Sequence, residues 1–301
     1  MTKPWCVVLA SREEPQWPRM APQGRIAAKQ SALKQCDPLT ATLRRAATVT
    51  SLERIAAMIA APADRWWQSS LNRLGMRNVF VQPKHQGTAY EVLLALLHLE
   101  RRTSPTTTVL FLPADHIVDD EEVMTNSLAT MVEWIGEEPG SVYLLGAVPQ
   151  GPHDQLGYIV PWHDPMLLPS GVYEFVERPD VVQARKLINS GGLWNTFIFG
   201  GSIASLINLF FPRFEAAVAE FRAALRSESA EPDLIHAFNR LMPADFSRDL
   251  LARQIDNLKV LRLMHCGWWP LKSPTRRQDL LSAPASRREA HGNVHEGLHK
   301  S

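Results

Sequence analysis

The stretch Thr106–Glu122, with the sequence TTTVLFLPADHIVDDEE, changes character at its midpoint. Its first half is uncharged and rich in β-branched and aliphatic residues, which favours a strand buried on both faces. Its second half presents Asp115, His116, Asp119 and Asp120 within six residues. In open α/β sheets, ligands bind in the crevice outside the carboxyl ends of the strands. We therefore expect a central strand that carries Asp115 at the edge of a ligand-binding cleft.

Two interpretations of these carboxylates remain open from the stretch alone. Asp115 at a strand end is well placed to hold a metal ion on a substrate. Alternatively, Asp115 or Asp119 only caps the helix that follows, which is a common position for aspartate.

The composition is that of an ordinary globular chain. Its 301 residues, 45% of them hydrophobic, suffice for one large α/β domain or two small ones. The formal net charge is +1 with acids and bases interspersed, so neither nucleic acid nor an anionic membrane is an expected partner. Three scattered cysteines form no CxxC pair, and the apolar runs are too short for a signal peptide or a membrane span. We expect a cytoplasmic protein that acts on small molecules.

Short apolar segments alternate with segments of helical spacing, which predicts a mainly parallel sheet covered on both faces. The expected strands are WCVVLA, NVFVQP, TVLFLPA, SVYLLGAV, VYEFVERP, WNTFIFG and LKVLRLMHC. A helix is expected from Thr88, which has capping-box spacing to Glu91. Gly87, just before it, would let a ligand approach the main chain closely, or it only makes a tight turn.

After about Thr275 the sequence becomes polar. We therefore expect one domain over residues 1–275 and a loose tail over 276–301. The sequence contains no GxGxxG, GxxxxGK[ST], GxSxG or HExxH motif. Dinucleotide oxidoreduction, P-loop hydrolysis, hydrolase-elbow chemistry and zincin chemistry therefore lack their usual sequence support.

An ordered set of short motifs spans most of residues 5 to 275. In chain order these are VVLA, AAKQ, FVQPKHQGTA, VLFLPADHIVDDE, LGYIVP, YEFVERPD, GGLWNTFIFG, DFSRDLLA and CGWWPLKSP. Together they resemble the catalytic domain of the mannose-1-phosphate guanylyltransferases, the GDP-mannose pyrophosphorylases, within the sugar nucleotidyltransferase superfamily. The resemblance implies a Rossmann-like, mixed α/β fold of the nucleotide-diphospho-sugar transferase type.

In such a domain a sugar-1-phosphate oxygen attacks the α-phosphate of a nucleoside triphosphate, and pyrophosphate leaves. No protein nucleophile is needed, so catalysis depends on positioning and on neutralising charge with cations and a metal ion. The resemblance implies GTP and mannose-1-phosphate as substrates and Mg²⁺ as the cofactor. The resemblance is also compatible with a homo-oligomer.

The resemblance also assigns roles to individual residues. Lys29 matches the family's phosphate-contacting lysine, Asp115 matches the aspartate that holds Mg²⁺, and His116 is expected to position groups rather than to exchange protons. The nucleotide-base region corresponds to Gln82, Pro83, Gly87 and Thr88, and the sugar-binding positions correspond to Gly157, Glu177 and Asn195. A strand end for Glu177 and a turn amide for Asn195 are the structural alternatives.

Three departures from the family pattern bear on activity. The glycine-rich phosphate loop is replaced by LASREEPQWPRMAPQGR, which has no glycine before Gly24. Arg12, Arg19 and Arg25 are candidates for the loop's arginine, and we take Arg19 as the catalytic one. Pro270 in CGWWPLK falls where the family has a second metal-binding aspartate, and Arg178 replaces a lysine, which keeps the charge but changes the geometry.

Two functions are therefore consistent with the sequence. The first is a sugar nucleotidyltransferase with impaired turnover. The alternative is a non-catalytic paralogue that binds a sugar nucleotide as a binding or regulatory protein. A metal-dependent glycosyltransferase is less favoured, because no DxD pair lies near Asp115.

Overall fold

The fold is given by a computed structural model that describes residues 3–10, 38–61, 71–72, 75–166, 168–211 and 213–270. Its strands are β1 (Trp5–Leu9), β2 (Ile55–Ala60), β3 (Asn78–Gln82), β4 (Thr108–Pro113), β5 (His116–Ile117), β6 (Val142–Ala147), β7 (Tyr158–Pro161), β8 (Ser170–Val176), β9 (Leu193–Ser202), β10 (Leu258–Leu263) and β11 (Trp269–Pro270). Its α-helices are α2 (Pro38–Val49), α4 (Thr88–Glu100), α5 (Glu121–Glu137), α6 (Val181–Asn189), α7 (Ile203–Asn208), α8 (Glu215–Arg226), α9 (Ala230–Arg240) and α10 (Phe246–Asp249).

One nine-stranded mixed sheet organises the described chain, in the order β3-β2-β1-β4-β9-β6-β10-β8-β7. The strands β3, β2, β1 and β4 pair in parallel, and so do β6 and β10. The strand β9 runs antiparallel to both β4 and β6. Because β9 is reversed, its amino-terminal residues lie at the same edge of the sheet as the carboxyl end of β4.

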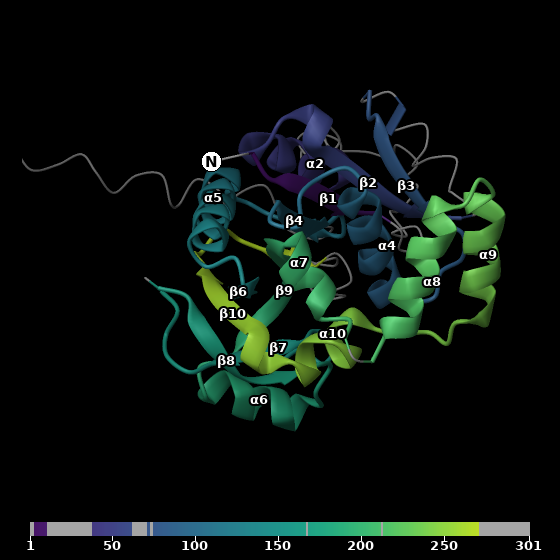
Figure 1. The fold of residues 1–301 in the computed structure, drawn as a ribbon. Helices are drawn as coiled ribbons and strands as arrows, with labels where there is room; N and C mark the ends of the chain where they lie inside the picture. The colour runs from purple at the N-terminus through teal and green to yellow at the C-terminus, as the bar shows by residue number, and fades with distance from the viewer. Residues whose placement is uncertain are drawn as a thin grey trace, which may run out of the picture.

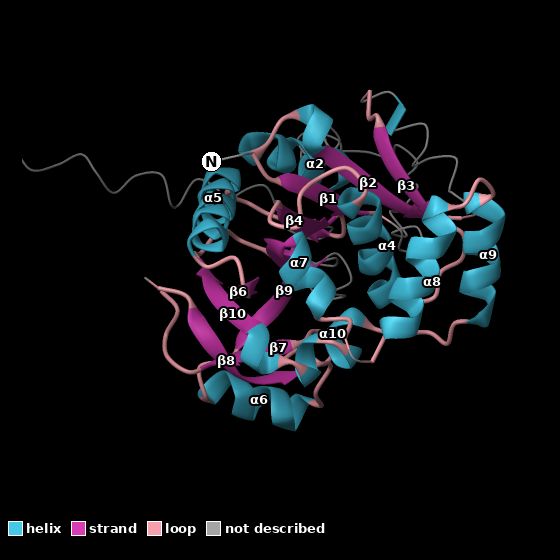
Figure 2. Cartoon of the chain, in the orientation of Figure 1, coloured by secondary structure: helices cyan, strands magenta, loops and turns pink. Residues whose placement is uncertain are grey.

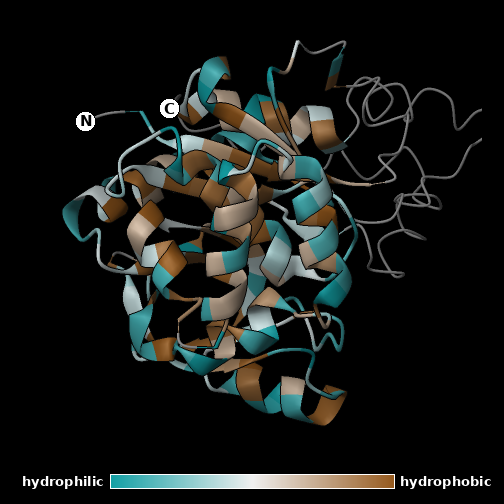
Figure 3. Cartoon of the chain, turned by 45° about the vertical axis from the view of Figure 1, so that its right-hand side comes forward, coloured by the Kyte–Doolittle hydropathy of each residue, from teal (hydrophilic) through white to brown (hydrophobic). Residues whose placement is uncertain are grey.

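Helices cover both faces of this sheet, as Figures 1 and 2 show. On one face α2, α5 and α6 contribute apolar residues to a core with inward-facing residues of β1, β4 and β6. On the other face α4, α7, α8, α9 and α10 form a second core. Figure 3 shows hydrophobic residues gathered in the strands and on the helix sides that face them.

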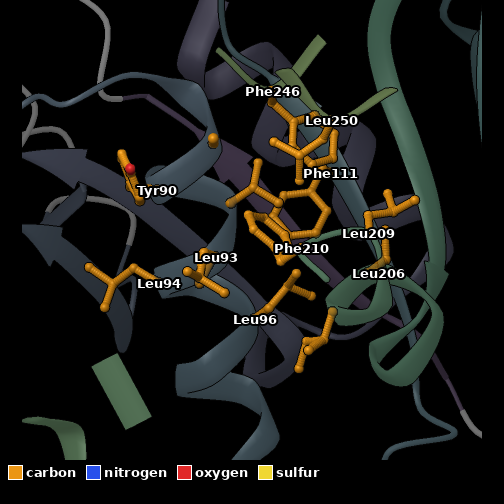
Figure 4. Close-up of a cluster of buried hydrophobic side chains, with 14 of the residues drawn as sticks. Tyr90, Leu93, Leu94, Leu96, Phe111, Leu206, Leu209, Phe210, Phe246 and Leu250 are labelled. Atoms are coloured by element: carbon orange, nitrogen blue, oxygen red, sulfur yellow. The ribbon is translucent and has the colours of Figure 1, made fainter. Parts of the chain in front are cut away.

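The helix α4 is the most deeply buried of the described helices that cover the second face. Eleven of its thirteen residues are buried, so it is apolar around most of its circumference, which is typical of a helix enclosed by other elements. Figure 4 shows its Tyr90, Leu93 and Leu96 in one cluster with Phe111 of β4 and with Phe210 and Phe246. This packing anchors the carboxyl ends of β3 and β4 relative to each other.

All seven expected strands are present, and the expected mixed α/β class is confirmed. The described sheet is mixed and not mainly parallel as expected, because only the β3-β2-β1-β4 run and the β6–β10 pair are parallel, while β7, β8 and β9 pair antiparallel with their neighbours. Four of the described strands were not expected from the sequence: β2 with its sequence IAAMIA, the four-residue β7, and the two-residue β5 and β11. Alanine disfavours strands intrinsically, and a four-residue strand offers too few positions for an alternation signal.

The expected helix after Gly87 is confirmed, but the capping-box prediction is wrong. The N-cap residue of α4 is Gly87, and the Thr88 hydroxyl instead accepts a hydrogen bond from the Phe246 backbone N–H at 2.8 Å. Gly87 has φ 95°, and a Cβ there would lie 2.1 Å from the Ala244 carbonyl oxygen. The close approach that requires this glycine is therefore made by another segment of the same chain.

Candidate active site

The carboxyl end of β4 continues into a second, two-stranded sheet. Ala114 donates its backbone N–H to the Leu9 carbonyl at 3.0 Å, which ties the end of β4 to the end of β1. Asp115 follows, and β5 then pairs antiparallel with β11, with His116 opposite Pro270. The backbone N–H groups of Asp119 and Asp120 both donate to the Cys266 carbonyl at 3.0 Å. These bonds fix the segment that carries Pro270 beside Asp115.

A cavity of about 220 Å³ opens at this edge of the sheet. Ten residues line it: Asp115, His116, His153, Gln155, Leu156, Arg178, Asn195, Thr196, Trp268 and Pro270. They come from the segment after β4 with β5, the loop before β7, the turn after β8, the start of β9, and β11 with the residue before it. As in other open α/β folds, the cavity therefore lies outside the carboxyl end of a central strand.

A β-bulge in β9 presents Asn195 and Thr196 to the cavity. The pairing of β6 with β9 shifts between Leu144 and Gly146, and bulges commonly redirect side chains beside functional sites. The Thr196 hydroxyl donates to the Leu145 carbonyl at 2.6 Å, which holds the bulge in place. The Asn195 Oδ1 accepts from the Phe197 backbone N–H at 3.1 Å, and Phe197 has a left-handed φ of 60°.

The amide of Asn195 therefore has a structural duty as well as a place in the cavity. Its Nδ2 also donates to the Ser247 hydroxyl at 3.3 Å. Each of its polar atoms keeps further hydrogen-bonding capacity, because an amide nitrogen has two donors and an amide oxygen has two lone pairs. The turn-amide alternative and the ligand-binding interpretation are compatible.

Glu177 and Arg178 follow the last residue of β8. The Glu177 carboxylate lies 3.5 Å from the Arg178 Nε, and Arg178 adopts a left-handed φ of 51°. Gly157 lies against this carboxylate, because a Cβ at that position would be 2.5 Å from the Glu177 Oε2. Gly157 also accepts from the Asn195 backbone N–H at 2.8 Å, so the three predicted sugar-binding positions are neighbours.

The loop before β7 contributes three lining residues, His153, Gln155 and Leu156, that the sequence did not indicate as site residues. The Tyr158 hydroxyl accepts from the His153 backbone N–H at 2.8 Å and from the Trp194 indole at 3.0 Å, which ties the loop to the core. The Gln155 backbone N–H donates to the His153 Nδ1 at 3.1 Å. Burial lowers the pKa of His153. These residues lie at the cavity because of the conformation of the loop, and no motif in the sequence HDQLG predicts that conformation.

His116 is held from behind by a buried arginine of α2. The Arg45 Nη1 lies 2.7 Å from the His116 Nε2, and Arg45 also donates to both Glu121 carboxylate oxygens at 2.7 and 2.8 Å. The side chain of Arg45 is only 1% exposed. Burial and the neighbouring Arg45 charge lower the pKa of His116 to about 3, so its ring is neutral at physiological pH.

The helix after this stretch is capped by Asp120, not by Asp115 or Asp119. The Asp120 side chain accepts from the Glu122 and Val123 backbone N–H groups, both at 3.1 Å. The alternative in which Asp115 or Asp119 only caps α5 is therefore wrong. Asp115 instead lines the cavity.

The other predicted site residues lie elsewhere. Gln82, Gly87 and Thr88 flank the junction of β3 and α4, and they do not belong to the described lining of this cavity. Gln82 is fully buried, with its Nε2 3.5 Å from the His85 Nδ1. Lys29 and Arg19 lie outside the described residues. Their roles stay predictions.

Few side chains at the carboxyl end of β4 could coordinate a metal ion. Among the described residues, no group of three or more His, Cys, Asp or Glu side chains could hold a metal ion. Asp115 supplies a carboxylate to the cavity, and Pro270 occupies the position opposite His116 without a coordinating side chain. Mg²⁺ is compatible with such a site, because it commonly uses one or two carboxylates with phosphate and water completing its shell.

Sequence comparison connects this arrangement to a family. A family model described as nucleotidyl transferase matches residues 32–208, which is more than half of the chain. This chain belongs to the nucleotidyl transferase family. Enzymes of this family generally use a divalent metal ion.

The curated relatives match only part of their own length. Alginate biosynthesis protein AlgA from Pseudomonas fluorescens is 32% identical over 136 residues, which cover 44% of this chain and 27% of AlgA. Mannose-1-phosphate guanylyltransferase from Salmonella muenchen is 26% identical over 234 residues, which cover 75% of this chain and 48% of that enzyme. The expected resemblance of this nucleotidyl transferase to mannose-1-phosphate guanylyltransferases is therefore confirmed.

Solved structures confirm the Rossmann-like fold of the nucleotidyl transferase. The structure of mannose-1-phosphate geranyltransferase from Thermus thermophilus has a TM-score of 0.72 at 24% identity and covers 94% of this chain and 80% of its own. Inositol-1-phosphate CTP transferase from T. maritima has a TM-score of 0.52 at 13% identity, with 92% of this chain and 93% of that chain covered. Within the described part of the nucleotidyl transferase, no helix has both the length and the apolar character that crossing a bilayer requires.

Proposed function

We propose that this nucleotidyl transferase joins a nucleoside triphosphate and a sugar-1-phosphate at the cavity beside Asp115, with release of pyrophosphate. GTP and mannose-1-phosphate are the substrates, by similarity to the curated relatives. The observation that carries the proposal is that residues far apart in the sequence line the same cavity. Asp115, Arg178 and Asn195, which are 63 and 17 residues apart along the chain, line one cavity at the carboxyl end of β4.

The reaction needs no covalent intermediate with the protein. The sugar-1-phosphate oxygen forms a bond to the α-phosphorus while the bond from that phosphorus to the bridging oxygen of pyrophosphate breaks. The two phosphate-bearing substrates repel each other, so the site must position them and offset their negative charge. A bound Mg²⁺ would supply most of that offset as a Lewis acid, and Asp115 would hold it.

The remaining residues would bind and orient substrate. Arg178 projects a side chain that is 59% exposed beside the cavity, and its guanidinium suits a phosphate. Glu177 and Asn195 would accept from and donate to sugar hydroxyls, with Gly157 leaving room for the Glu177 carboxylate. Gln82, Gly87 and Thr88 would form the base-binding region, and Lys29 and Arg19 would contact the phosphates. We place the reaction in the cytoplasm.

Pro270 favours a second candidate function. A site with one carboxylate holds Mg²⁺ less tightly than a site with two, which would slow transfer while leaving the sugar side of the cavity intact. The chain would then act as a binding or regulatory protein for a sugar nucleotide. The two functions share the cavity and differ in turnover.

A substrate panel separates these functions. Purified full-length protein is incubated with Mg²⁺, each nucleoside triphosphate and each sugar-1-phosphate, and pyrophosphate and nucleotide sugar are measured together with thermal stability. We expect product with GTP and mannose-1-phosphate and a higher Tm with GDP-mannose. A higher Tm without product would favour the binding protein. Folded protein that shows neither a Tm shift nor product with any combination would reject both functions.

A further inference from the structure

The buried contact between Arg45 and His116 fixes where the imidazole proton lies. The Arg45 Nη1 is 2.7 Å from the His116 Nε2, and a guanidinium nitrogen can only donate. The His116 Nε2 must therefore accept, because an N–H at that position would point at the N–H of arginine. The ring is neutral, and its one proton resides on Nδ1.

The arginine is itself held so that it cannot turn away. Its Nε and Nη2 donate to the two carboxylate oxygens of Glu121 in a bidentate pair, which leaves Nη1 for the histidine. Glu121 begins α5 and Arg45 lies in α2. Two helices therefore hold the ring of His116 in one orientation at the end of β4.

The proton on Nδ1 has no acceptor among the described residues. The His116 Nδ1 is buried without a hydrogen-bond partner, although the ring lines the cavity beside Asp115. The Trp268 Nε1, in a second residue that lines the cavity, is likewise a buried donor without a partner in the described part of the chain. A buried donor without an acceptor is costly, so two of them at one cavity point to an acceptor that the ligand brings.

We propose that His116 binds the ligand, donating its Nδ1–H to a phosphoryl oxygen bound beside Asp115, with Arg45 as the positioning residue that sets the tautomer. This inference rests on the proposed phosphate-bearing substrate of the cavity. An anionic oxygen is the acceptor that gains most from a neutral donor in a buried setting.

The tautomer is tested first, in the free protein. Nitrogen NMR of protein labelled with ¹⁵N-histidine distinguishes a protonated ring nitrogen from an unprotonated one. We expect the His116 resonances at neutral pH to show a protonated Nδ1 and an unprotonated Nε2. A proton on Nε2, or a doubly protonated ring, overturns the proposal regardless of any ligand.

Two replacements of His116 then separate its two hydrogen bonds. In His116→Gln the longer side chain can still accept from Arg45 but offers no donor at the Nδ1 position. In His116→Asn the amide nitrogen can take the place of Nδ1, while Arg45 loses its acceptor. His236→Gln is the matched control, because His236 is exposed on α9.

Binding of GDP-mannose and of inorganic pyrophosphate with Mg²⁺ is measured by calorimetry on each folded variant. We expect His116→Gln to keep its Tm but to bind roughly tenfold to a hundredfold more weakly, as for the loss of a hydrogen bond to a charged group. His116→Asn should lose Tm yet stay within about threefold of wild-type affinity, and His236→Gln should match wild type.

The possible results assign failure to one claim or the other. If wild type binds both probes and His116→Gln binds them equally well, this inference is wrong and the proposed function stands. Equal loss of affinity in His116→Gln and His116→Asn also overturns it, because the donor-retaining variant then gives no rescue. If wild type binds neither probe, both the proposed function and this inference are wrong.

Discussion

At the scale of single residues, two aspartates of one short segment have different roles. Asp120 caps α5 through the Glu122 and Val123 backbone N–H groups, whereas Asp115 lines the cavity. The sequence shows both acids at the end of a buried strand, but it could not assign the cap. That assignment depends on where the first turn of α5 begins, and the residue at which a helix begins is among the least certain features of a sequence pattern.

Replacing each aspartate by alanine should therefore give opposite results. Asp120→Ala should reduce the free energy of unfolding by about 0.5–2 kcal/mol, as for a lost N-cap, and leave metal-dependent product formation close to wild type. Asp115→Ala should abolish product formation while the cap of α5 stays in place. Denaturant melts and product assays on both variants check this. An active Asp115→Ala protein would remove Asp115 from the proposed site.

Gly157 offers a second test at this scale. A Cβ there would lie 2.5 Å from the Glu177 Oε2, which is the far end of a flexible side chain. Gly157→Ala should therefore displace the Glu177 carboxylate, weaken GDP-mannose binding about tenfold, as for one lost hydrogen bond to a charged group, and change the Tm little. Gly151→Ala is the control, since nothing lies within 4 Å of its Cβ position. Equal affinity in the two variants would show that Glu177 does not bind the sugar.

At the scale of elements, seven of the eleven described strands were predictable from the sequence, and the contacts between distant segments were not. Apolar runs in the sequence predict β4 and β9, but no sequence pattern predicts the bulge that presents Asn195. The Arg45 contact with His116 joins residues 71 positions apart, and no local pattern indicates it. The sequence therefore indicated Asp115 and Asn195 as residues of the cavity, whereas the contacts that support them became apparent only in the fold.

The docking of α4 on the segment before α10 gives a prediction at this scale. Gly87 and Gly75 both have left-handed φ values, but only Gly87 has its Cβ space filled, by the Ala244 carbonyl. Gly75→Ala should lower the free energy of unfolding by about 1 kcal/mol, from backbone strain alone. Gly87→Ala should lower the free energy of unfolding by distinctly more, because the backbone of Ala244 must move as well. Urea denaturation of both proteins measures the difference, and equal losses would contradict the docking.

At the scale of the whole molecule, the stability should depend on pH through a histidine far from the cavity. His98 of α4 stacks on Phe80 with ring centroids 4.5 Å apart. Burial, with the charges of Arg102 and Arg101, lowers its pKa from 6.5 to about 4. Between these pH values only the unfolded chain binds the proton, so the stability falls as the pH drops from about 6.5 to 4.

Replacing this histidine by phenylalanine isolates its share of the pH dependence. His98→Phe keeps the stack on Phe80 and removes the titrating group. The difference in free energy of unfolding between His98→Phe and wild type should change in favour of the variant as the pH falls from 6.5 to 4. The expected change is on the order of 2–3 kcal/mol, at about 1.36 kcal/mol per pKa unit. Denaturant melts across this range give the comparison. Parallel pH profiles would mean that His98 titrates normally in the folded protein.

The most direct measurement of the proposed function is the rate at which the wild-type chain makes GDP-mannose. Full-length protein with Mg²⁺, GTP and mannose-1-phosphate should release pyrophosphate and GDP-mannose in equal amounts. Because Pro270 supplies no carboxylate, the rate should fall below about 1 per second, the lower end of ordinary enzymatic turnover. A rate within the ordinary range, about 1 to 10³ per second, would contradict the account of Pro270. Folded protein that forms neither product would contradict nucleotidyl transfer itself.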